Sequence, residues 1–329
     1  FTVNAATAFG GDSSAITSCY GPEQLDANTI RLVGSYNSNG DFPPTNTSAF
    51  IYTGAIDQAN GTTEGFTEYQ HPGATWTFFH STQEGLGVGN WDNTVTIPDT
   101  NRPIIGTGRA FIYEVSSGLS IADIAYPGSK STTAYGIAKV NDDLFAITGS
   151  YSLDDEPDGV AHGYLVYYRR SDNSFSEWTS WDVNDVALGN IASHADGISY
   201  NSTDNTFTLA TWTIDAATGL PLTGQLMTVQ RTADGGFGER LWTEVNYNNQ
   251  PGGTTVPTSV AGDVMTGEYE ASDGSVTTWS SETSFFVDPS NVISGNGGNG
   301  IAIIGSTTAV ETNNTIAQNR IGTSADGSI

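Results

Sequence analysis

The sequence predicts an all-β protein, a five-bladed β-propeller, from three observations. A phrase of small or polar residues that ends in an aromatic recurs five times, and successive copies lie 55, 60, 61 and 57 residues apart. A short apolar segment follows every copy, and no stretch of useful length has the periodicity of a helix. Repeats of this length that are built from strand-like segments are typical of propellers and solenoids. Solenoid coils are usually shorter, which favours the propeller.

Each unit contains four strand-like segments in the same order. A run of small residues that ends in Gly comes first, and the recurring phrase follows, as in Val33-Gly34-Ser35-Tyr36. An apolar segment and a more polar segment complete the unit, with turn residues between them, which is the pattern of half-buried antiparallel strands. The apolar segments are residues 49–52, 110–113, 164–167, 226–229 and 285–287, and the polar ones are residues 66–69, 120–124, 175–178 and 240–244.

The fifth unit has no fourth segment of its own. The chain begins with a strand-like piece, residues 1–6, which we expect to complete blade five and close the ring. Closure of this kind removes an exposed edge strand, which otherwise invites aggregation. We expect the blade boundaries near Pro43, Pro103, Gly159, Gly219 and Gly274.

The pattern changes from residue 288 onward, which predicts two domains: a propeller over residues 1–287 and a β-helix-like tail over residues 288–329. Residues 291–296 recur as residues 314–319, an offset of 23. Their Asn-x-Ile-x-x-Asn pattern is similar to the coils of right-handed parallel β-helices in large bacterial surface proteins, where Ile stacks inward and Asn and Gly take the bends. Fewer than three coils are too few to be stable alone. We therefore expect the tail to continue into a longer polypeptide, to pack on another copy, or to dock on its own propeller.

Charge excludes several classes of partner. The chain has 10 Lys and Arg against 36 Asp and Glu, a formal net charge of -26. Nucleic acid is excluded because its binding depends on Lys and Arg, and anionic membrane surfaces are disfavoured for the same reason. No apolar run approaches the length of a membrane span. The acidity suits either solubility in salty or calcium-containing surroundings or a surface that depends on cations.

A single cysteine, Cys19, excludes an intramolecular disulfide. It lies in a segment of small residues, which predicts a buried apolar filler rather than a nucleophile.

Short motifs in the second and third units carry a family resemblance. Residues 110–113 read Ala-Phe-Ile-Tyr, residues 125–128 Ala-Tyr-Pro-Gly, residues 133–137 Thr-Ala-Tyr-Gly-Ile and residues 147–151 Ile-Thr-Gly-Ser-Tyr. This order resembles the bacterial extracellular repeat family that is named for its His-Ala-Phe signature. The resemblance covers residues 10–287 and implies a secreted or surface-exposed bacterial protein.

A ligand site is expected first at the propeller axis, where the inner strands of all blades converge. We assign Tyr20, His80, Tyr135, His194 and Asp196 to this channel. His80 and His194 fall at comparable places in blades two and four, and with Asp196 they suit a metal site or an acid–base site. The other interpretation is that these residues only line a wet channel.

Three carboxylates near the inner strands are candidates for sugar hydrolysis, which needs two carboxyl groups at a set separation. They are Glu84, Asp196 and Asp263, and nothing in their spacing selects a pair.

An acidic loop is a candidate calcium site because it crowds hard oxygen ligands together. Its spacing does not fit an EF-hand loop, so an ordinary solvated turn is the alternative. The residues are Asp154, Asp155, Glu156 and Asp158.

Together these observations predict a secreted or cell-surface protein that works by binding, as an adhesion or extracellular assembly module without catalysis. We expect self-association and partners that are other extracellular protein subunits or polysaccharide. The alternative is a secreted polysaccharide-active hydrolase or lyase with its site at the propeller axis. An axis plugged by small residues favours binding, whereas carboxylates that converge in an axial cavity favour the enzyme.

Overall fold

The computed structural model describes residues 3–12, 14–38, 47–59, 64–92, 108–183, 191–246, 253–271, 273–283, 292–293 and 320–321. Contacts divide the chain into two units, Phe1–Ser281 and Glu282–Ile329. Within the described ranges, no helix is long and apolar enough to cross a membrane.

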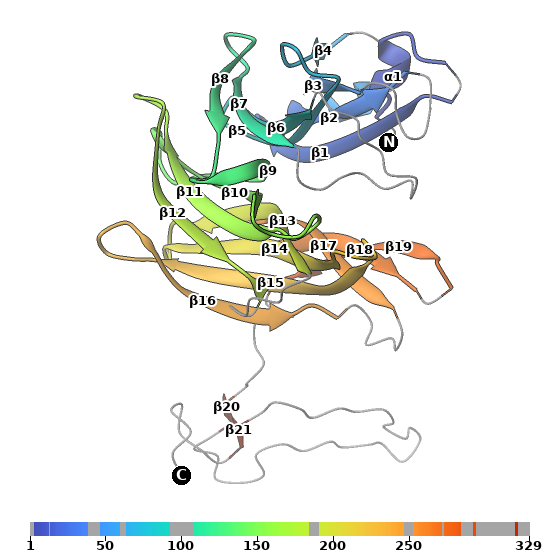
Figure 1. Cartoon of the computed structure of the whole chain (residues 1–329). Coiled ribbons are helices and arrows are strands. Elements are labelled where there is room, and N and C mark those ends of the chain that lie inside the picture. The colour runs from blue at the N-terminus through green and yellow to red at the C-terminus, as the bar shows by residue number, and fades with distance from the viewer. Residues whose placement is uncertain are drawn as a thin grey trace, which may run out of the picture. The chain divides into compact units, whose positions relative to one another are not determined.

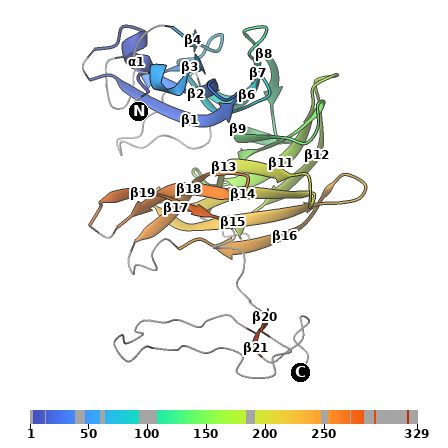
Figure 2. The same cartoon turned by 180° about the vertical axis from the view of Figure 1, so that it is seen from behind.

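Five antiparallel sheets follow one another along the first unit and form a five-bladed β-propeller (Figures 1 and 2). Within each sheet the strands are ordered as in the sequence. Blades one and two comprise β1 (Ile16–Gln24), β2 (Ile30–Asn37), β3 (Ser48–Gly54) and β4 (Phe66–Tyr69), then β5 (Trp76–Gln83), β6 (Leu86–Asp92), β7 (Arg109–Glu114) and β8 (Leu119–Ile124). Blades three and four comprise β9 (Ser129–Lys139), β10 (Leu144–Leu153), β11 (His162–Arg169) and β12 (Ser174–Trp181), then β13 (Ile191–Asn201), β14 (Thr206–Asp215), β15 (Pro221–Arg231) and β16 (Phe237–Glu244). Blade five comprises β17 (Thr254–Ala261), β18 (Val264–Glu270) and β19 (Val276–Glu282).

The first strand of each blade is the inner strand. β1 contacts β5, β5 contacts β9, β9 contacts β13, and β13 contacts β17, so these strands lie nearest the axis. The apolar third strands lie further out and carry the cores. Phe50 of β3 and Phe111 of β7 are completely buried, and burial of such a side chain stabilises the fold by about 1.5–3 kcal/mol.

The cores also join neighbouring blades. Leu86 and Ile112 of blade two pack in one cluster with Ile147 and Tyr164 of blade three. The apolar segments recognised in the sequence therefore hold the blades together.

The recurring phrase forms the second strand of every blade, and a close contact explains its Gly. A Cβ atom on Gly34, Gly89, Gly149 or Gly267 would lie 1.9 to 2.3 Å from a carbonyl oxygen of the inner strand. Real Cβ atoms do not approach so closely, so any larger residue would push the two strands apart.

The N-terminal segment does not complete blade five, so that prediction is wrong for the residues described. Ala5–Ala8 forms the short helix α1, and Asn4 caps it by accepting a hydrogen bond from the Thr7 N–H at 3.0 Å. Ala5 and Ala6 pack into the core of blade one. The reason is local: Asn is a preferred N-cap, and alanines favour the helix that follows it.

Two further expectations about the strands need correction. The expected blade boundaries fall between the second and third strands of each blade, whereas the blades meet between the fourth strand and the next first strand. The third strand of blade five is β19, and the segment expected there, residues 285–287, lies outside the described residues.

The second unit contains a short parallel pair, β20 (Val292–Ile293) with β21 (Arg320–Ile321). Val292 pairs with Arg320 rather than with Thr315, which is the partner that an offset of 23 predicts. The other residues of the expected coils lie outside the described residues, so the β-helix-like extension stays a prediction.

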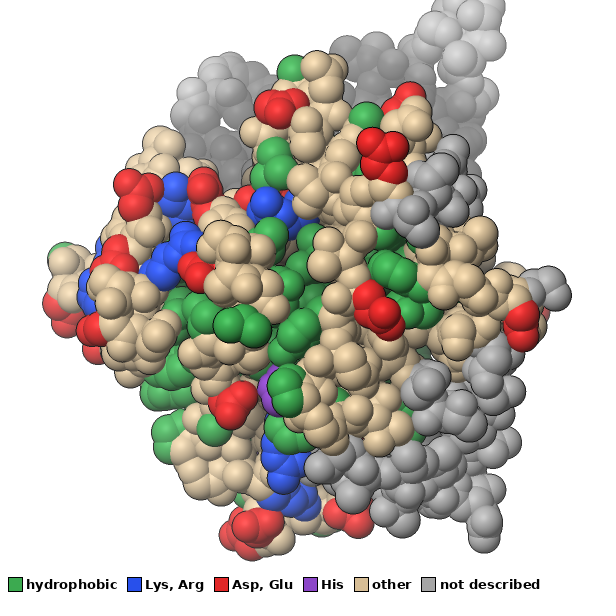
Figure 3. Space-filling view, turned by 90° about the horizontal axis from the view of Figure 1, so that it is seen from above, with side chains coloured by type: hydrophobic (Ala, Val, Ile, Leu, Met, Phe, Trp, Pro, Cys, Tyr) green, Lys and Arg blue, Asp and Glu red, His purple; other side chains and the backbone are tan. Residues whose placement is uncertain are grey.

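The surface agrees with the acidic composition. On the face shown in Figure 3, acidic side chains are scattered over the molecule, whereas Lys and Arg occupy a few clusters. Several basic side chains are paired with acids, as Arg170 is with Glu114 at 3.0 Å.

Candidate functional site

The inner strands of all five blades line one cavity at the propeller axis. Its volume is about 830 Å³, within the range of roughly 300–1,000 Å³ that is common for small-molecule sites. The axis is therefore an open cavity with polar and aromatic side chains in its wall. It is not plugged by small residues, which was the other arrangement considered from the sequence. Its lining includes all five residues assigned to the axis from the sequence: Tyr20, His80, Tyr135, His194 and Asp196.

A β-bulge in every inner strand aims side chains into this cavity. In β5 the register with β6 shifts between Phe79 and Ser81, which leaves His80 without a partner strand residue. Bulges are common beside active sites because the extra residue re-aims its side chain. The corresponding shifts fall at Gly21 and Pro22 in β1, Tyr135 in β9, Asp196 in β13 and Thr258 in β17.

Four aromatic side chains from four blades form an arc along the cavity wall. The ring centroids of Tyr20 and His80 are 5.2 Å apart, and those of His80 and Tyr135 are 4.6 Å apart. Tyr135 and His194 are separated by 4.1 Å. Blade five contributes no aromatic side chain to the described lining, so this aromatic arc covers one side of the cavity.

At one end of the aromatic arc, Asp196 is held from two sides. The Trp212 Nε1–H donates a hydrogen bond to Asp196 Oδ2 at 2.9 Å. His194 Nδ1 lies 2.6 Å from Asp196 Oδ1, although it is not aligned for a hydrogen bond. The two side chains are 14% and 20% exposed, respectively, and both line the cavity. A histidine next to a carboxylate that is held in place is a common arrangement for general acid–base chemistry.

Burial sets the protonation state of the cavity wall. Desolvation lowers the pKa of His80 to about 4, with Asp196 opposing the shift and His194 adding to it. His80 is therefore neutral at neutral pH. Desolvation also raises the pKa of Tyr135 and Tyr20, and the charge of Asp196 contributes to both shifts, so the two phenols stay protonated.

Cys19 lies in the cavity wall, and the prediction of a buried filler is wrong. Its side chain is exposed to the cavity, yet desolvation by the surrounding protein raises the pKa of the thiol to about 11. Because the thiolate is the nucleophile, this residue is unreactive at neutral pH.

Three residues of the site were missed in the sequence. Glu268 and Lys139 line the cavity, and Trp212 orients Asp196 from the neighbouring strand. The Glu268 side chain is exposed and makes no ion pair or hydrogen bond with the described residues. A signal existed for it, because it is the one charged residue at its position in the recurring phrase, where the other blades have Ser35, Asn90, Ser150 and Thr211, all buried.

Glu84 and Asp263, the other two candidate carboxylates, do not line the cavity. Glu84 accepts a hydrogen bond from Lys139 Nζ at 3.0 Å, and Lys139 also pairs with Asp142 at 2.9 Å. Asp263 is exposed in the hairpin turn between β17 and β18. Of the three carboxylates chosen from the sequence, only Asp196 lines the cavity, and the second acid there is Glu268.

The acidic loop of blade three is paired with cations of the chain itself. Glu156 Oε1 lies 2.6 Å from His162 Nε2, and Asp158 lies 3.7 Å from Lys130 Nζ. Within the described part of the chain, no three His, Cys, Asp or Glu side chains gather as a metal site. Calcium at this loop, and a metal held by the two axial histidines, therefore have no support beyond the sequence pattern.

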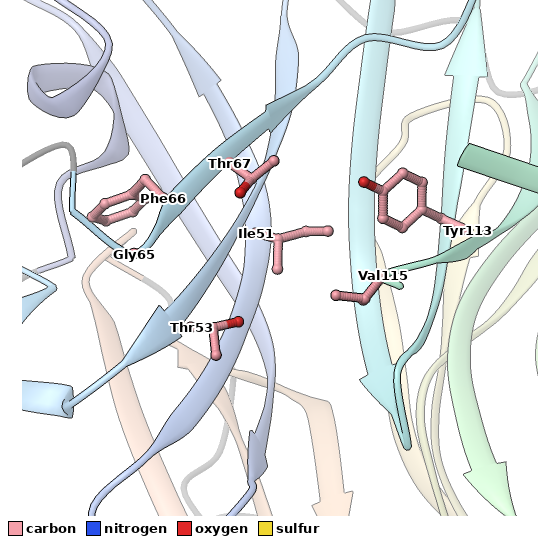
Figure 4. A pocket seen from close by; sticks show the side chains of 7 residues that line it. All are labelled: Ile51, Thr53, Gly65, Phe66, Thr67, Tyr113 and Val115. Atoms are coloured by element: carbon pink, nitrogen blue, oxygen red, sulfur yellow. The ribbon is translucent and has the colours of Figure 1, made fainter. Parts of the chain in front are cut away.

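A second, smaller pocket of about 290 Å³ lies between blades one and two (Figure 4). Its wall combines apolar and hydroxyl side chains and contains no His, Asp, Glu or Cys, so it offers no acid–base pair. The lining residues are Ile51, Thr53, Gly65, Phe66, Thr67, Tyr113 and Val115.

No protein-family model matches the sequence, and no curated protein matches it either, so the resemblance to His-Ala-Phe repeats stays a prediction. Several solved structures are similar. A native arabinanase from Bacillus subtilis is 9% identical with a TM-score of 0.41, over 83% of this chain and 98% of that chain. A glycoside hydrolase family 43 arabinoxylan arabinofuranohydrolase from Bacillus subtilis, in complex with cellotetraose, is 11% identical with a TM-score of 0.39, over 74% of this chain and 54% of that chain. An acylaminoacyl peptidase from Pyrococcus horikoshii is 6% identical with a TM-score of 0.35, over 82% of this chain and 45% of that chain.

The prediction of a binding or assembly module without catalysis is wrong against these findings. Glycoside hydrolases are among the similar structures, and the axis is a cavity rather than a plug. The alternative, a polysaccharide-active hydrolase, is the interpretation that agrees with them. At these identities the likeness places no residue of the site, so the function has to be derived from the side chains of the cavity.

Proposed function

We propose that this chain is a polysaccharide-active hydrolase whose site is the axial cavity. The observation that supports it most is Asp196, a carboxylate that a β-bulge turns into the cavity and that Trp212 holds next to His194. Hydrolysis of a glycosidic bond needs carboxyl groups of this kind, with one ionised and one able to give a proton.

The second carboxyl group of this proposal is Glu268. In the described lining of the cavity, Asp196 and Glu268 are the two acidic side chains. The Trp212 N–H fixes the orientation of the Asp196 carboxyl group, which suits a general base or nucleophile. Glu268 has no partner among the described residues, which leaves it available to protonate the leaving oxygen.

The aromatic arc supplies the surface for a sugar ring. Tyr20 is 41% exposed, and the faces of such rings cover the apolar C–H side of a sugar while the phenol hydroxyl reaches its oxygen atoms. His80 is neutral at neutral pH and can exchange hydrogen bonds with sugar hydroxyls without adding a charge.

Hydrolysis is favoured over elimination by the charge of the site. A lyase removes the proton next to a carboxyl group, so its substrate is a polymer of uronic acids. Such an anionic chain would be repelled by Asp196, Glu268 and the net charge of -26. Lys139 is the one cation in the described lining, and it is already paired with Glu84 and Asp142.

An extracellular location is part of the same proposal. The acidity of the chain and its few basic residues, 10 Lys and Arg among 329, support it. The size of a polysaccharide substrate supports it as well. Self-association and binding to other extracellular subunits stay predictions from the sequence.

The test is release of reducing ends from a panel of polysaccharides by the full chain. Arabinan and arabinoxylan belong in the panel, together with chitosan, and polygalacturonate serves as the anionic control. We expect cleavage of at least one non-anionic polymer and a loss of about 10²-fold or more in the rate with Asp196→Asn.

The matched control is Asp263→Asn, the same change at an exposed acid outside the cavity lining. It should keep the full rate. Absence of cleavage across the panel, or equal rates for Asp196→Asn and the unchanged chain, would contradict the proposal.

A further inference from the structure

We infer that the axial cavity selects amino sugars, that is, sugar units that carry a free ammonium group. This inference rests on the proposed function and names its substrate class. The supporting features, all among the described residues, are the aromatic arc, an acid of blade five without a side-chain partner, and the scarcity of positive charge in the lining.

The aromatic arc has the dimensions of a cation-binding surface. Its four rings come from four blades, and neighbouring centroids are 4.1 to 5.2 Å apart. An ammonium group within about 6 Å of a ring centroid is attracted by the negative face of the ring. A ligand amine next to Tyr135 would therefore also lie within reach of the neighbouring His80 and His194 rings.

The acids of the cavity add a negative field to these rings. Asp196 lies at the end of the aromatic arc, and its charge reaches both tyrosines, since it contributes to the raised pKa of Tyr20 and of Tyr135. Glu268 acts on Tyr20 in the same direction. Both acids line the same cavity as the arc, Asp196 next to His194 and Glu268 on β18 of blade five.

The cavity wall holds little positive charge to compensate these acids. Lys139 is engaged by Glu84 at 3.0 Å and by Asp142 at 2.9 Å. His80 is neutral at neutral pH because its pKa is about 4. Glu268 is exposed, and its side chain has no partner among the described residues, so an ammonium group on the ligand could pair with it, whereas a neutral sugar could not.

The size of the cavity favours a sugar over a small amine. At about 830 Å³ it is far larger than one ammonium group requires. Blade five adds no aromatic ring to the described lining, where Thr258 and Ser259 lie together with Glu268. An oligosaccharide can then lie across the cavity with one amine against the arc.

The experiment compares two oligosaccharides of equal length that differ only in an amine, measured by calorimetry with the full chain. Glucosamine oligomers carry the ammonium group, and cello-oligosaccharides have a hydroxyl at the same carbon. Below the pKa of the sugar amine, we expect the glucosamine oligomer to bind about tenfold or more tightly. This preference should shrink when salt is raised from about 0.02 M to about 0.5 M.

Charge-removing variants locate the preference. Glu268→Gln should reduce the ratio of the two dissociation constants by about threefold or more, whereas Asp263→Asn should leave it unchanged. Thermal melting of both variants shows that they are folded.

The outcomes separate the inference from the proposed function, because binding is measured without turnover. Equal or weaker binding of the glucosamine oligomer overturns the inference, and so does a ratio that Glu268→Gln leaves unchanged. If either of these results were found and the chain still cleaved arabinan or arabinoxylan, the proposed hydrolase function would stand and the preference for amino sugars would be excluded.

Discussion

Blade four differs from the other four blades at one place in the repeat. In those blades a threonine of the inner strand pairs with the aromatic that ends the phrase, whereas in blade four His194 pairs with Trp212. Blade four also has Ala210 where the other phrases have Gly. The four threonines are Thr17, Thr77, Thr132 and Thr255.

The cause of the difference is the position of the bulge. In blade two the register shifts opposite Val88 and Gly89, but in blade four it shifts opposite Ala210 and Thr211, one residue along. This displacement accommodates a Cβ on Ala210 and turns Asp196 into the cavity. The comparison teaches that the candidate chemistry lies where the structural repeat is interrupted.

The largest expected effect is a loss of stability when the Gly of the recurring phrase in blade three is replaced by Ala. In Gly149→Ala the new Cβ would lie 1.9 Å from the Thr133 carbonyl oxygen. We expect a loss of about 4 kcal/mol in the free energy of unfolding, because neither backbone can yield without breaking the sheet. Urea denaturation measures it. The reciprocal change, Ala210→Gly, should cost only about 1 kcal/mol, and equal losses at both positions would break the comparison.

The next effect comes from restoring the repeat in blade four. His194→Thr installs the threonine found in the other blades and removes the imidazole next to Asp196. If the cavity is the hydrolytic site, the rate should fall by about 10²-fold, since general acid–base groups contribute on this scale. The control is Thr77→Ser in blade two, which should keep the rate. Unchanged activity in His194→Thr would remove blade four from the mechanism.

His162 of blade three provides a comparison with His194 of blade four, because its protonation should make the stability of the fold depend on pH. His162 is bound on both ring nitrogens, by Asp182 at 2.8 Å and by Glu156 at 2.6 Å, whereas His194 contacts one acid. The hydrogen bond to Asp182, with Glu156 in support and burial opposing, raises the pKa of His162 to about 9.

A raised pKa means that the folded chain holds this proton more tightly than the unfolded chain. The stabilisation is therefore complete below about pH 6.5 and is lost as the pH rises through about 9, by about 3 kcal/mol. Denaturation of the unchanged chain and of His162→Gln across this range measures it. Parallel curves for the two proteins would refute the assignment.

A smaller effect tests the indole that orients Asp196. Trp212 and Trp91 occupy the same place in their blades, but the Trp91 Nε1 is buried and has no hydrogen-bond partner among the described residues. Replacement of either by Phe removes similar ring area, while only Trp212→Phe removes a hydrogen bond to a carboxylate. We expect Trp212→Phe to be the more destabilising by about 1.5 kcal/mol. A difference near zero would mean that Asp196 is held by other contacts.

The smallest expected effect concerns calcium. Glu156 and Asp158 are paired with His162 and Lys130 in blade three. A chelator should therefore shift the melting temperature by less than about 1 °C. A drop of several degrees would restore the calcium site that the acidic loop suggests in the sequence.

The sequence predicted the blades because packing imposes a pattern that recurs. The recurring Gly reflects a carbonyl contact in four blades, and the apolar third strands reflect burial between blades. The N-terminal strand was predicted wrongly because pairing with blade five was assumed, although Asn4 before a run of small residues is a helix-start signal.

The candidate site was only partly visible in the sequence. Its five expected residues share one cavity because the first strands could be aligned by their position in the units. The bulges could not be predicted, since a register shift depends on the pairing of two strands and not on either one alone. Glu268 was missed because only the first strands were searched for axial residues, and Glu84 was chosen although Lys139 pairs with it at 3.0 Å.

The inner-strand carbonyl oxygen that lies against the Gly of the recurring phrase also limits which residues the sequence can have at that position. Gly34, Gly89, Gly149 and Gly267 admit no other residue in the present register, whereas Ala210 shows that a shift of one residue lifts the restriction. In a randomised library these four codons would stay nearly invariant and the fifth would tolerate substitution. Sliding a bulge by one residue is thus a route by which a new side chain can enter the axis of a propeller without a change in strand number.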